Sequence, residues 1–166
     1  MTWLIVIVGL VAIQRLGELV LANRNTKRLL ERGAVEIGAA HYPVMVLMHS
    51  AWLVSLLVFI PPDTVPDLAL LVVFGLLQLG RVWVIASLGP YWTTRIITLP
   101  DAPLVTRGPY RFVKHPNYWV VAGEIAILPL AFGSITLALV FTVLNALILM
   151  IRISAENEAL SARQPT

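Results

Sequence analysis

The sequence predicts an all-α membrane protein, a polytopic bundle of about five transmembrane helices. Three observations lead to this fold class. Of the 166 residues, 58% are hydrophobic and 13% are charged, too few charged residues to cover a soluble domain of this size. The hydrophobic residues gather in five stretches, none with the period-2 alternation of a barrel strand. The lysines and arginines are concentrated in only some of the connecting segments.

The five apolar stretches cover residues 2–22, 44–60, 68–88, 118–132 and 135–153. A helix needs about 20 residues to cross ~30 Å of hydrocarbon, so the first, third and fifth stretches are long enough and the second is marginal. The fourth is short and contains Glu124 and Pro129, so we expect it to pack inside the bundle rather than face lipid. The first stretch lacks a basic start and a small-residue cleavage site, which predicts a retained span rather than a signal peptide.

The distribution of basic residues predicts the orientation. Segments 23–40 and 89–117 and the C-terminal tail carry lysines and arginines, whereas the turn at 61–67 has only acidic charges and the turn at 132–134 has none. With five spans, all the basic segments fall on one side, which the positive-inside rule makes cytoplasmic. We therefore expect the N-terminus outside, the C-terminus inside, and any site built from the basic segments on the cytoplasmic face of a membrane, most simply a bacterial inner membrane.

Composition also narrows the chemistry. The chain has no cysteine, which excludes disulfides, thiolate metal sites and cysteine nucleophiles, and no cluster of His, Asp and Glu has metal-ligand spacing. The net charge of +3 could suit nucleic acid or anionic lipid, and the apolar composition favours lipid. We expect a bilayer and a lipophilic molecule as partners, with no nucleic acid and no metal, and one domain over residues 1–166.

Segment 89–117 is long for a loop in so small a protein, and long loops are often functional. It mixes arginines and a lysine with aromatic residues, and His115 lies near its end. One interpretation is a basic loop that lies on anionic headgroups. A second charged cluster, at the inner end of the last apolar stretch, favours another interpretation. There Arg152 and Glu156 are four residues apart on one helical face, and together with the loop they could form a pocket for a zwitterionic ligand.

Three motifs carry a resemblance to a known family. They are Leu-Val-x-x-Gly-x-Tyr at 104–110, Lys-His-Pro-Asn-Tyr at 114–118, and Arg-x-x-x-Glu at 152–156. In combination and in this order they resemble the isoprenylcysteine carboxyl methyltransferase family of integral-membrane methyltransferases, over about the last 75 residues. Two positions depart from the family pattern. Lys114 replaces an arginine, which loses bidentate geometry, and Asn157 replaces the second residue of a Glu-Glu pair. Either Glu156 or Glu158 could then fill the acidic position, and the offset from Arg152 favours Glu156.

The resemblance implies a site for S-adenosyl-L-methionine in a catalytic region at 89–160. Arg152, Glu156 and His115 would be the catalytic residues, and Arg152 would bind the substrate. The cofactor would be bound by Leu104, Val105, Tyr110, Lys114, His115, Pro116, Asn117, Tyr118 and Glu156. A carboxylate or enolate acceptor needs no general base, whereas a phenol or thiol would have to lose a proton, for which His115 is a candidate.

Other polar residues have simpler interpretations. We expect His41 to lie at the start of a helix, His49 to be a packed core histidine, and Asn145 to hydrogen-bond between helices. Arg15 and Glu18 are three residues apart and predict an intrahelical pair. Glu124 could be functional, or it could pair with Arg81 or Arg15.

The sequence therefore predicts a methyltransferase that transfers a methyl group to a carboxylate or to an enol or phenol oxygen of a lipophilic substrate. The acceptor could be prenylcysteine-like or a long-chain alkyl metabolite, and the compact form favours the latter. Three alternatives stay open: a phospholipid N-methyltransferase, an NADPH-dependent membrane reductase resembling sterol reductases, and a membrane scaffold without activity.

Overall fold

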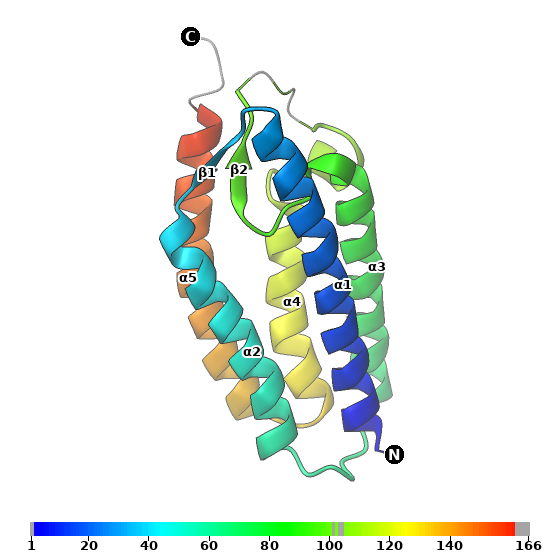
Figure 1. Cartoon of the computed structure of the whole chain (residues 1–166). Coiled ribbons are helices and arrows are strands. Elements are labelled where there is room, and N and C mark those ends of the chain that lie inside the picture. The colour runs from blue at the N-terminus through cyan, green and yellow to red at the C-terminus, as the bar shows by residue number, and fades with distance from the viewer. Residues whose placement is uncertain (1, 101, 103–104, 162–166) are drawn as a thin grey trace.

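The computed structural model describes residues 2–100, 102 and 105–161 and contains five α-helices in this part of the chain (Figure 1). Their bounds are α1 Trp3–Glu31, α2 Tyr42–Phe59, α3 Leu68–Leu88, α4 Pro116–Ala131 and α5 Ile135–Ser161. Four of them, α1, α2, α3 and α5, are long and apolar enough to cross a membrane, which identifies a multi-pass membrane protein. The prediction of an all-α transmembrane bundle is confirmed.

Two helices extend beyond the apolar stretches that predicted them. Helix α1 continues for nine residues past residue 22 because the basic segment that follows contains good helix formers and no Gly or Pro. It ends where Gly33 adopts a φ of 89°, and the amide of Ala34 donates to the Leu29 carbonyl at 3.0 Å. Helix α5 likewise runs on to Ser161 and carries the Arg152–Glu156 motif in its final turns.

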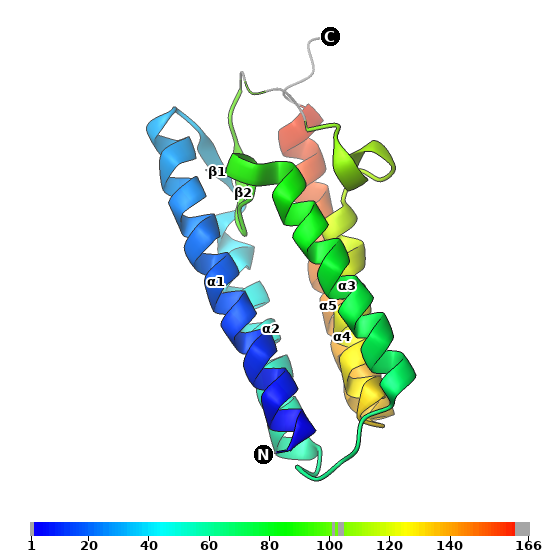
Figure 2. The same ribbon diagram turned by 90° about the vertical axis from the view of Figure 1, so that its right-hand side faces the viewer.

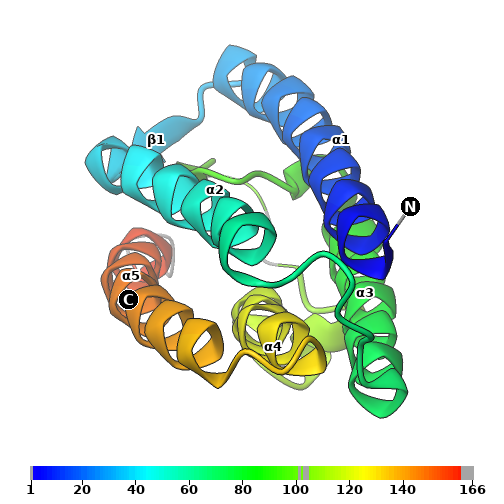
Figure 3. The same cartoon turned by 90° about the horizontal axis from the view of Figure 1, so that it is seen from below.

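Helix α4 has 16 residues and lies between α3 and α5 (Figure 3). It begins at Pro116, a residue suited to the first helical position because it has no amide to leave unpaired. Glu124, Ile125 and Leu128 are fully buried along it. The expectation that this short stretch packs inside the bundle is confirmed.

Seen from below, the helices form a ring in the order α1, α2, α5, α4, α3 (Figure 3). Four charged side chains connect α1 with its neighbour α3 and with α4. Arg81 donates to Glu18 (Nε to Oε1, 2.6 Å) and lies 3.3 Å from Glu124, while Arg15 contacts Glu18 at 3.0 Å and Glu124 at 2.6 Å. The predicted Arg15–Glu18 pair is confirmed, and Glu124 pairs with both of its candidate arginines. The two cations and two anions neutralise one another, which lowers the cost of holding charge at membrane depth.

A two-stranded antiparallel sheet, which the sequence did not predict, lies at one end of the bundle. Strand β1, Val35–Ile37, pairs with β2, Ile96–Thr98, in the register Val35↔Thr98 and Ile37↔Ile96. The pair joins the segment after α1 to the segment after α3, and a 3.0 Å ion pair between Arg95 and Glu36 reinforces it. Three-residue strands are too short to give a period-2 signal.

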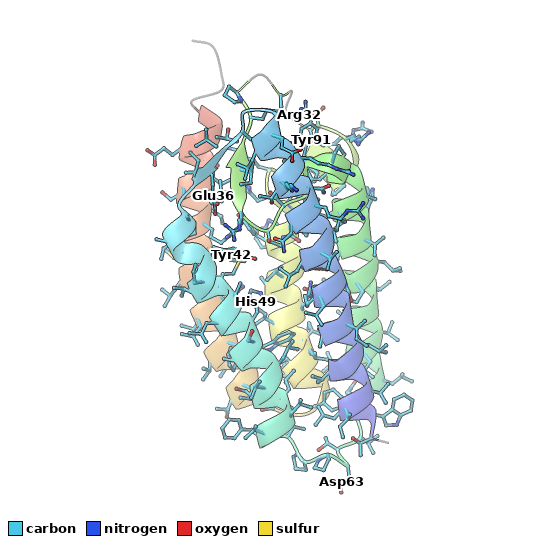
Figure 4. All side chains as sticks on the ribbon, viewed as in Figure 1. Arg32, Glu36, Tyr42, His49, Asp63 and Tyr91 are labelled. Carbon is cyan, nitrogen blue, oxygen red and sulfur yellow. The ribbon has the colours of Figure 1, made fainter. Side chains whose placement is uncertain are left out.

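The basic segments lie together at one end of the molecule. Arg32 and Tyr91 are at this end and Asp63, in the acidic turn, is at the other (Figure 4). In Figure 2, α1 and α2 lie on one side and α3, α4 and α5 on the other, with β1 and β2 at the end where the basic segments meet. The one-sided arrangement of charge follows from the structure, and the orientation of this end toward the cytoplasm stays a prediction.

Candidate active site

A cavity of about 490 Å³ lies at the basic end of the bundle. Its walls come from the end of α1, the segment 88–99, the segment 105–115, the first turn of α4 and the end of α5. Two short 3-10 helices shape this region, η2 at Gly89–Tyr91 and η3 at Gly108–Arg111. The cavity is lined by both apolar and charged side chains, among them Ile96, Val105, Lys114 and Glu156.

Two anchors hold the segments over this cavity. The buried amide of Asn25, on α1, donates to the carbonyls of Gly89 (3.1 Å) and Trp92 (2.9 Å), which fixes the turn after α3. On the other side Gly108 packs against α3 with a φ of 59°, and a β-carbon there would lie 2.1 Å from Oγ of Ser87. Only glycine fits this position, which explains the Gly in the Leu-Val-x-x-Gly-x-Tyr motif in physical terms.

The carboxylate of Glu156 is at the centre of a hydrogen-bonded cluster. The hydroxyl of Tyr118 donates to Oε2 of Glu156 at 2.6 Å, and Nδ1 of His115 lies 3.4 Å from the same oxygen. The rings of His115 and Tyr118 stack with centroids 5.4 Å apart. Nε2 of His115 lies 3.2 Å from Oδ1 of Asn157, so both ring nitrogens face oxygens. This arrangement suits the doubly protonated ring, and the Glu156 carboxylate raises the pKa of His115 above its ordinary value.

Arg152 lies one helical turn before Glu156 and is buried, with 6% of its surface exposed. Its Nη2 donates to the carbonyl of Thr94 at 3.0 Å. Among the residues that the structure describes, no carboxylate lies within 4.0 Å of this guanidinium, and its buried Nε has no partner. Glu156, one turn further along α5, interacts with this guanidinium electrostatically from beyond ion-pair distance, so the unpaired Nε can still bind an anionic ligand.

The structure brings most of the predicted site residues to this one cavity. Its lining includes Val105, Tyr110, Lys114, His115, Asn117, Tyr118, Arg152 and Glu156. Burial raises the pKa of Tyr110, so its hydroxyl stays protonated and can donate. Pro116 is buried at the start of α4 and does not line the cavity, and Leu104 lies outside the described residues. Glu156 lines the cavity and Glu158 does not, which is the arrangement expected if Glu156 fills the acidic position.

Sequence reasoning missed the part of the lining that comes from before residue 104. Trp92, Thr93 and Ile96–Leu99 form one wall, and Leu29 reaches it from α1. The aromatic residues of 89–92 indicated that the segment was unusual, but the Asn25 anchor and the β1–β2 pairing, which place it over the cavity, are long-range contacts. Leu29 gave no signal, because nothing in the sequence distinguishes it from other leucines of α1.

The remaining polar residues follow the simpler interpretations with one exception. His41 directly precedes α2, and His49 lies within α2 with Nδ1 2.9 Å from the Met45 carbonyl. Asn145 was expected to hydrogen-bond between helices, but its buried Oδ1 has no partner among the described residues, so that expectation is wrong for this atom. In the same part of the chain, no group of three or more His, Asp or Glu side chains could hold a metal ion.

Comparison with known proteins supports the resemblance seen in the motifs. The model of the isoprenylcysteine carboxyl methyltransferase (ICMT) family matches residues 68–162. The uncharacterized protein YpbQ of Bacillus subtilis is 36% identical over 164 residues, which are 96% of each chain. An uncharacterized protein of Haemophilus influenzae is 27% identical over 155 residues, 89% of this chain and 88% of the other. No solved structure matches the chain significantly.

Proposed function

Because the chain belongs to the isoprenylcysteine carboxyl methyltransferase family of membrane methyltransferases, we propose that it transfers the methyl group of S-adenosyl-L-methionine to an oxygen of a lipophilic acceptor. Residues 1–166 act as one domain whose catalytic region is 89–160. The acceptor oxygen belongs to a carboxylate, as in a prenylcysteine, or to an enol or phenol, as in a long-chain alkyl metabolite.

The residues of the large cavity fit this cofactor. A volume of about 490 Å³ lies within the range of small-molecule sites. The cofactor has a carboxylate, an ammonium group, ribose hydroxyls and an adenine ring, and the lining offers a partner for each. Lys114 is a cation for the carboxylate, Glu156 is an anion for the ammonium group, and the Tyr110 hydroxyl and the apolar Val105 and Ile96 suit the ribose and adenine.

When bound, the cofactor supplies an electrophilic methyl group on a sulfonium. The chain's own contribution is to position the acceptor and exclude water. Arg152 supports the proposed acceptor, because this buried cation at the wall of the cavity has no carboxylate within 4.0 Å among the described residues. An anionic oxygen beside it would gain a charge-assisted hydrogen bond. A phospholipid amine there would be repelled, so the observation favours O-methylation over N-methylation.

The proposed route separates the two reactants. The polar cofactor arrives from the cytoplasm and lies beneath segment 89–117, and the acceptor enters sideways from the inner leaflet. This follows from the predicted orientation with the N-terminus outside and the C-terminus inside, and from the position of Arg152, whose apolar stem can remain among the helices while its guanidinium faces the cavity.

Two binding experiments test the proposal. Calorimetric titration of the purified protein with S-adenosylhomocysteine should show binding, and titration with NADPH should not. Binding of NADPH and not of S-adenosylhomocysteine would identify a reductase instead. Binding of neither ligand would favour a membrane scaffold without activity.

Arg152 is tested in the same preparation. Arg152→Ala should raise the KM for the acceptor and leave the affinity for S-adenosylhomocysteine nearly unchanged, and Arg152→Lys should recover part of the loss. If Arg152→Ala weakens the interaction with the acceptor and with S-adenosylhomocysteine equally, Arg152 belongs to the cofactor site and the proposed role is wrong.

A further inference from the structure

A second cavity, of about 80 Å³, lies beside the large one and deeper in the bundle. The two cavities share Trp92, Thr93, Asn117, Tyr118 and Arg152 as a common wall. Helices α2 and α5 complete the smaller cavity. Its volume is enough for a few water-sized groups, and so for the polar head of a small molecule but not for a whole cofactor.

Four buried polar atoms, which have no hydrogen-bond partner in the described part of the chain, belong to residues that line this small cavity. They are Nε1 of Trp92, Oδ1 of Asn117, Oδ1 of Asn145 and Nε of Arg152. Trp92 is 3% exposed, Asn145 2% and Arg152 6%. Buried polar groups in folded proteins usually have a hydrogen-bond partner, so four such atoms at one cavity favour a polar occupant that satisfies them.

The charges around the cavity identify the sign of that ligand. Two buried arginines line it, Arg81 and Arg152. Arg81 is neutralised by Glu18 and Glu124, whereas Arg152 has no carboxylate within 4.0 Å among the described residues. The arginine without an ion pair among the described residues therefore lies at the wall shared with the large cavity, where a negatively charged oxygen would be stabilised.

His49 adds a proton acceptor to the same cavity. It lies midway along α2, and its Nδ1 is 2.9 Å from the Met45 carbonyl, an acceptor that requires Nδ1 to carry the proton (Figure 4). In the neutral ring Nε2 is then free of its proton and can accept one. His115 is unlike His49 in this respect, because both of its ring nitrogens face side-chain oxygens.

We propose that the small cavity is the head-group site of the methyl acceptor and that it selects an ionisable hydroxyl of an enol or phenol, with His49 as the proton acceptor. The inference rests on the proposed methyltransferase function and narrows its acceptor. A hydroxyl head fits the mixture of partners better than a carboxylate does. It donates to His49 Nε2 on arrival, and once ionised it accepts from Trp92 Nε1 and Arg152 Nε. A carboxylate has no proton to donate to Nε2 of His49.

The proposed reaction moves one proton and one methyl group. The acceptor's O–H bond breaks and its proton moves to Nε2 of His49, leaving the electron pair on oxygen. That oxygen forms a bond to the methyl carbon of S-adenosyl-L-methionine while the carbon–sulfur bond breaks, and its electron pair stays on sulfur. The products are the methyl ether, S-adenosylhomocysteine and a protonated His49, which returns its proton to water after the products leave.

The test compares two acceptors in the purified wild-type protein, 5-pentadecylresorcinol as the hydroxyl probe and N-acetyl-S-farnesylcysteine as the carboxylate probe. The resorcinol should be methylated with the higher kcat/KM. His49→Gln should lower kcat for the resorcinol by about 100-fold or more, the contribution of a general base, while its KM and the affinity for S-adenosylhomocysteine change less than about threefold. His41→Gln is the matched control, because His41 lines neither cavity, and it should behave as wild type.

Asn145→Leu removes an unpaired oxygen from the small cavity and leaves the lining of the large cavity unchanged. It should raise the KM for the resorcinol by roughly tenfold, because the second hydroxyl of the resorcinol loses an oxygen to which it can donate, and leave the affinity for S-adenosylhomocysteine unchanged.

Unchanged kcat in His49→Gln, or methylation of the farnesylcysteine with no turnover of the resorcinol, would each overturn the inference. Failure of wild type to bind S-adenosylhomocysteine would overturn the proposed function instead.

Discussion

Replacing Glu156 by glutamine tests the site at its most connected residue. The variant keeps the shape of the side chain and removes its charge. In the structure Oε2 accepts a 2.6 Å hydrogen bond from Tyr118 and lies 3.4 Å from His115, and 32% of the side chain is exposed. Solvent therefore screens this carboxylate only in part, and a charged hydrogen bond from the cofactor's ammonium group would be worth about 1.5–3 kcal/mol.

That free energy sets the expected result. A loss of about 1.5–3 kcal/mol corresponds to a roughly 10- to 150-fold weaker affinity for S-adenosylhomocysteine, measured by calorimetry in detergent. Glu156→Ala should be weaker still, because Tyr118 and His115 would lose their shared acceptor. Glu158→Gln is the matched control, since Glu158 does not line the cavity and its replacement should change the affinity less than about twofold. An unchanged affinity in Glu156→Gln, or the larger effect in Glu158→Gln, would refute the assignment of Glu156 to the cofactor.

Four further predictions follow from the geometry. Glu156 raises the pKa of His115, so the ring of His115 binds a proton more tightly in the folded protein than in the unfolded chain. The protonated ring therefore stabilises the fold below about pH 6.5, and this stabilisation is lost as the pH rises through the raised pKa. His115→Gln should flatten that part of the thermal-stability profile, and an unchanged slope would contradict the pairing. Gly108→Ala should cost about 1–2 kcal/mol from its φ of 59° alone, and adding Ser87→Ala should recover only the part due to the 2.1 Å clash. Glu124→Gln should destabilise the bundle by roughly 3–5 kcal/mol in a melting experiment, because Arg15 and Arg81 share its carboxylate, and near-wild-type melting would show that Glu18 alone suffices. A reporter fused to the C-terminus should be active in the cytoplasm, and activity only on the outer side would reverse the predicted orientation.

The bundle itself could be predicted well from the sequence. The apolar stretches gave each helix to within a few residues at its membrane end, because in lipid the length and hydropathy of a segment leave few alternatives to a helix. The helix ends that lie outside the apolar stretches were harder to predict. Helix α1 runs nine residues past its apolar part, where helix propensity and not hydropathy decides. Glu124 and Pro129 correctly indicated a helix inside the bundle.

The site was predictable only in part, and the reason is physical. Motifs located the side chains on η3, α4 and α5, which are close in the sequence, and the structure places them around one cavity. The opposite wall depends on the pairing of β1 with β2, two three-residue strands about 60 positions apart, and no local pattern encodes such a contact. The same holds for Asn145. A polar residue in a span predicts a partner on another helix, and its unpaired oxygen becomes visible only when the small cavity is in place.

The match to the family model begins at residue 68, the first residue of α3, yet both cavities are completed by residues that come before it. Leu29 of α1 reaches the large cavity, and Met45 and His49 of α2 line the small one. Under the proposed function, α2 therefore contributes to the choice of acceptor, whereas α1 also helps to build the large cavity through Leu29 and Asn25. Exchanging residues 1–67 for the corresponding part of YpbQ is therefore expected to transfer acceptor preference while cofactor affinity stays with α3, α4 and α5.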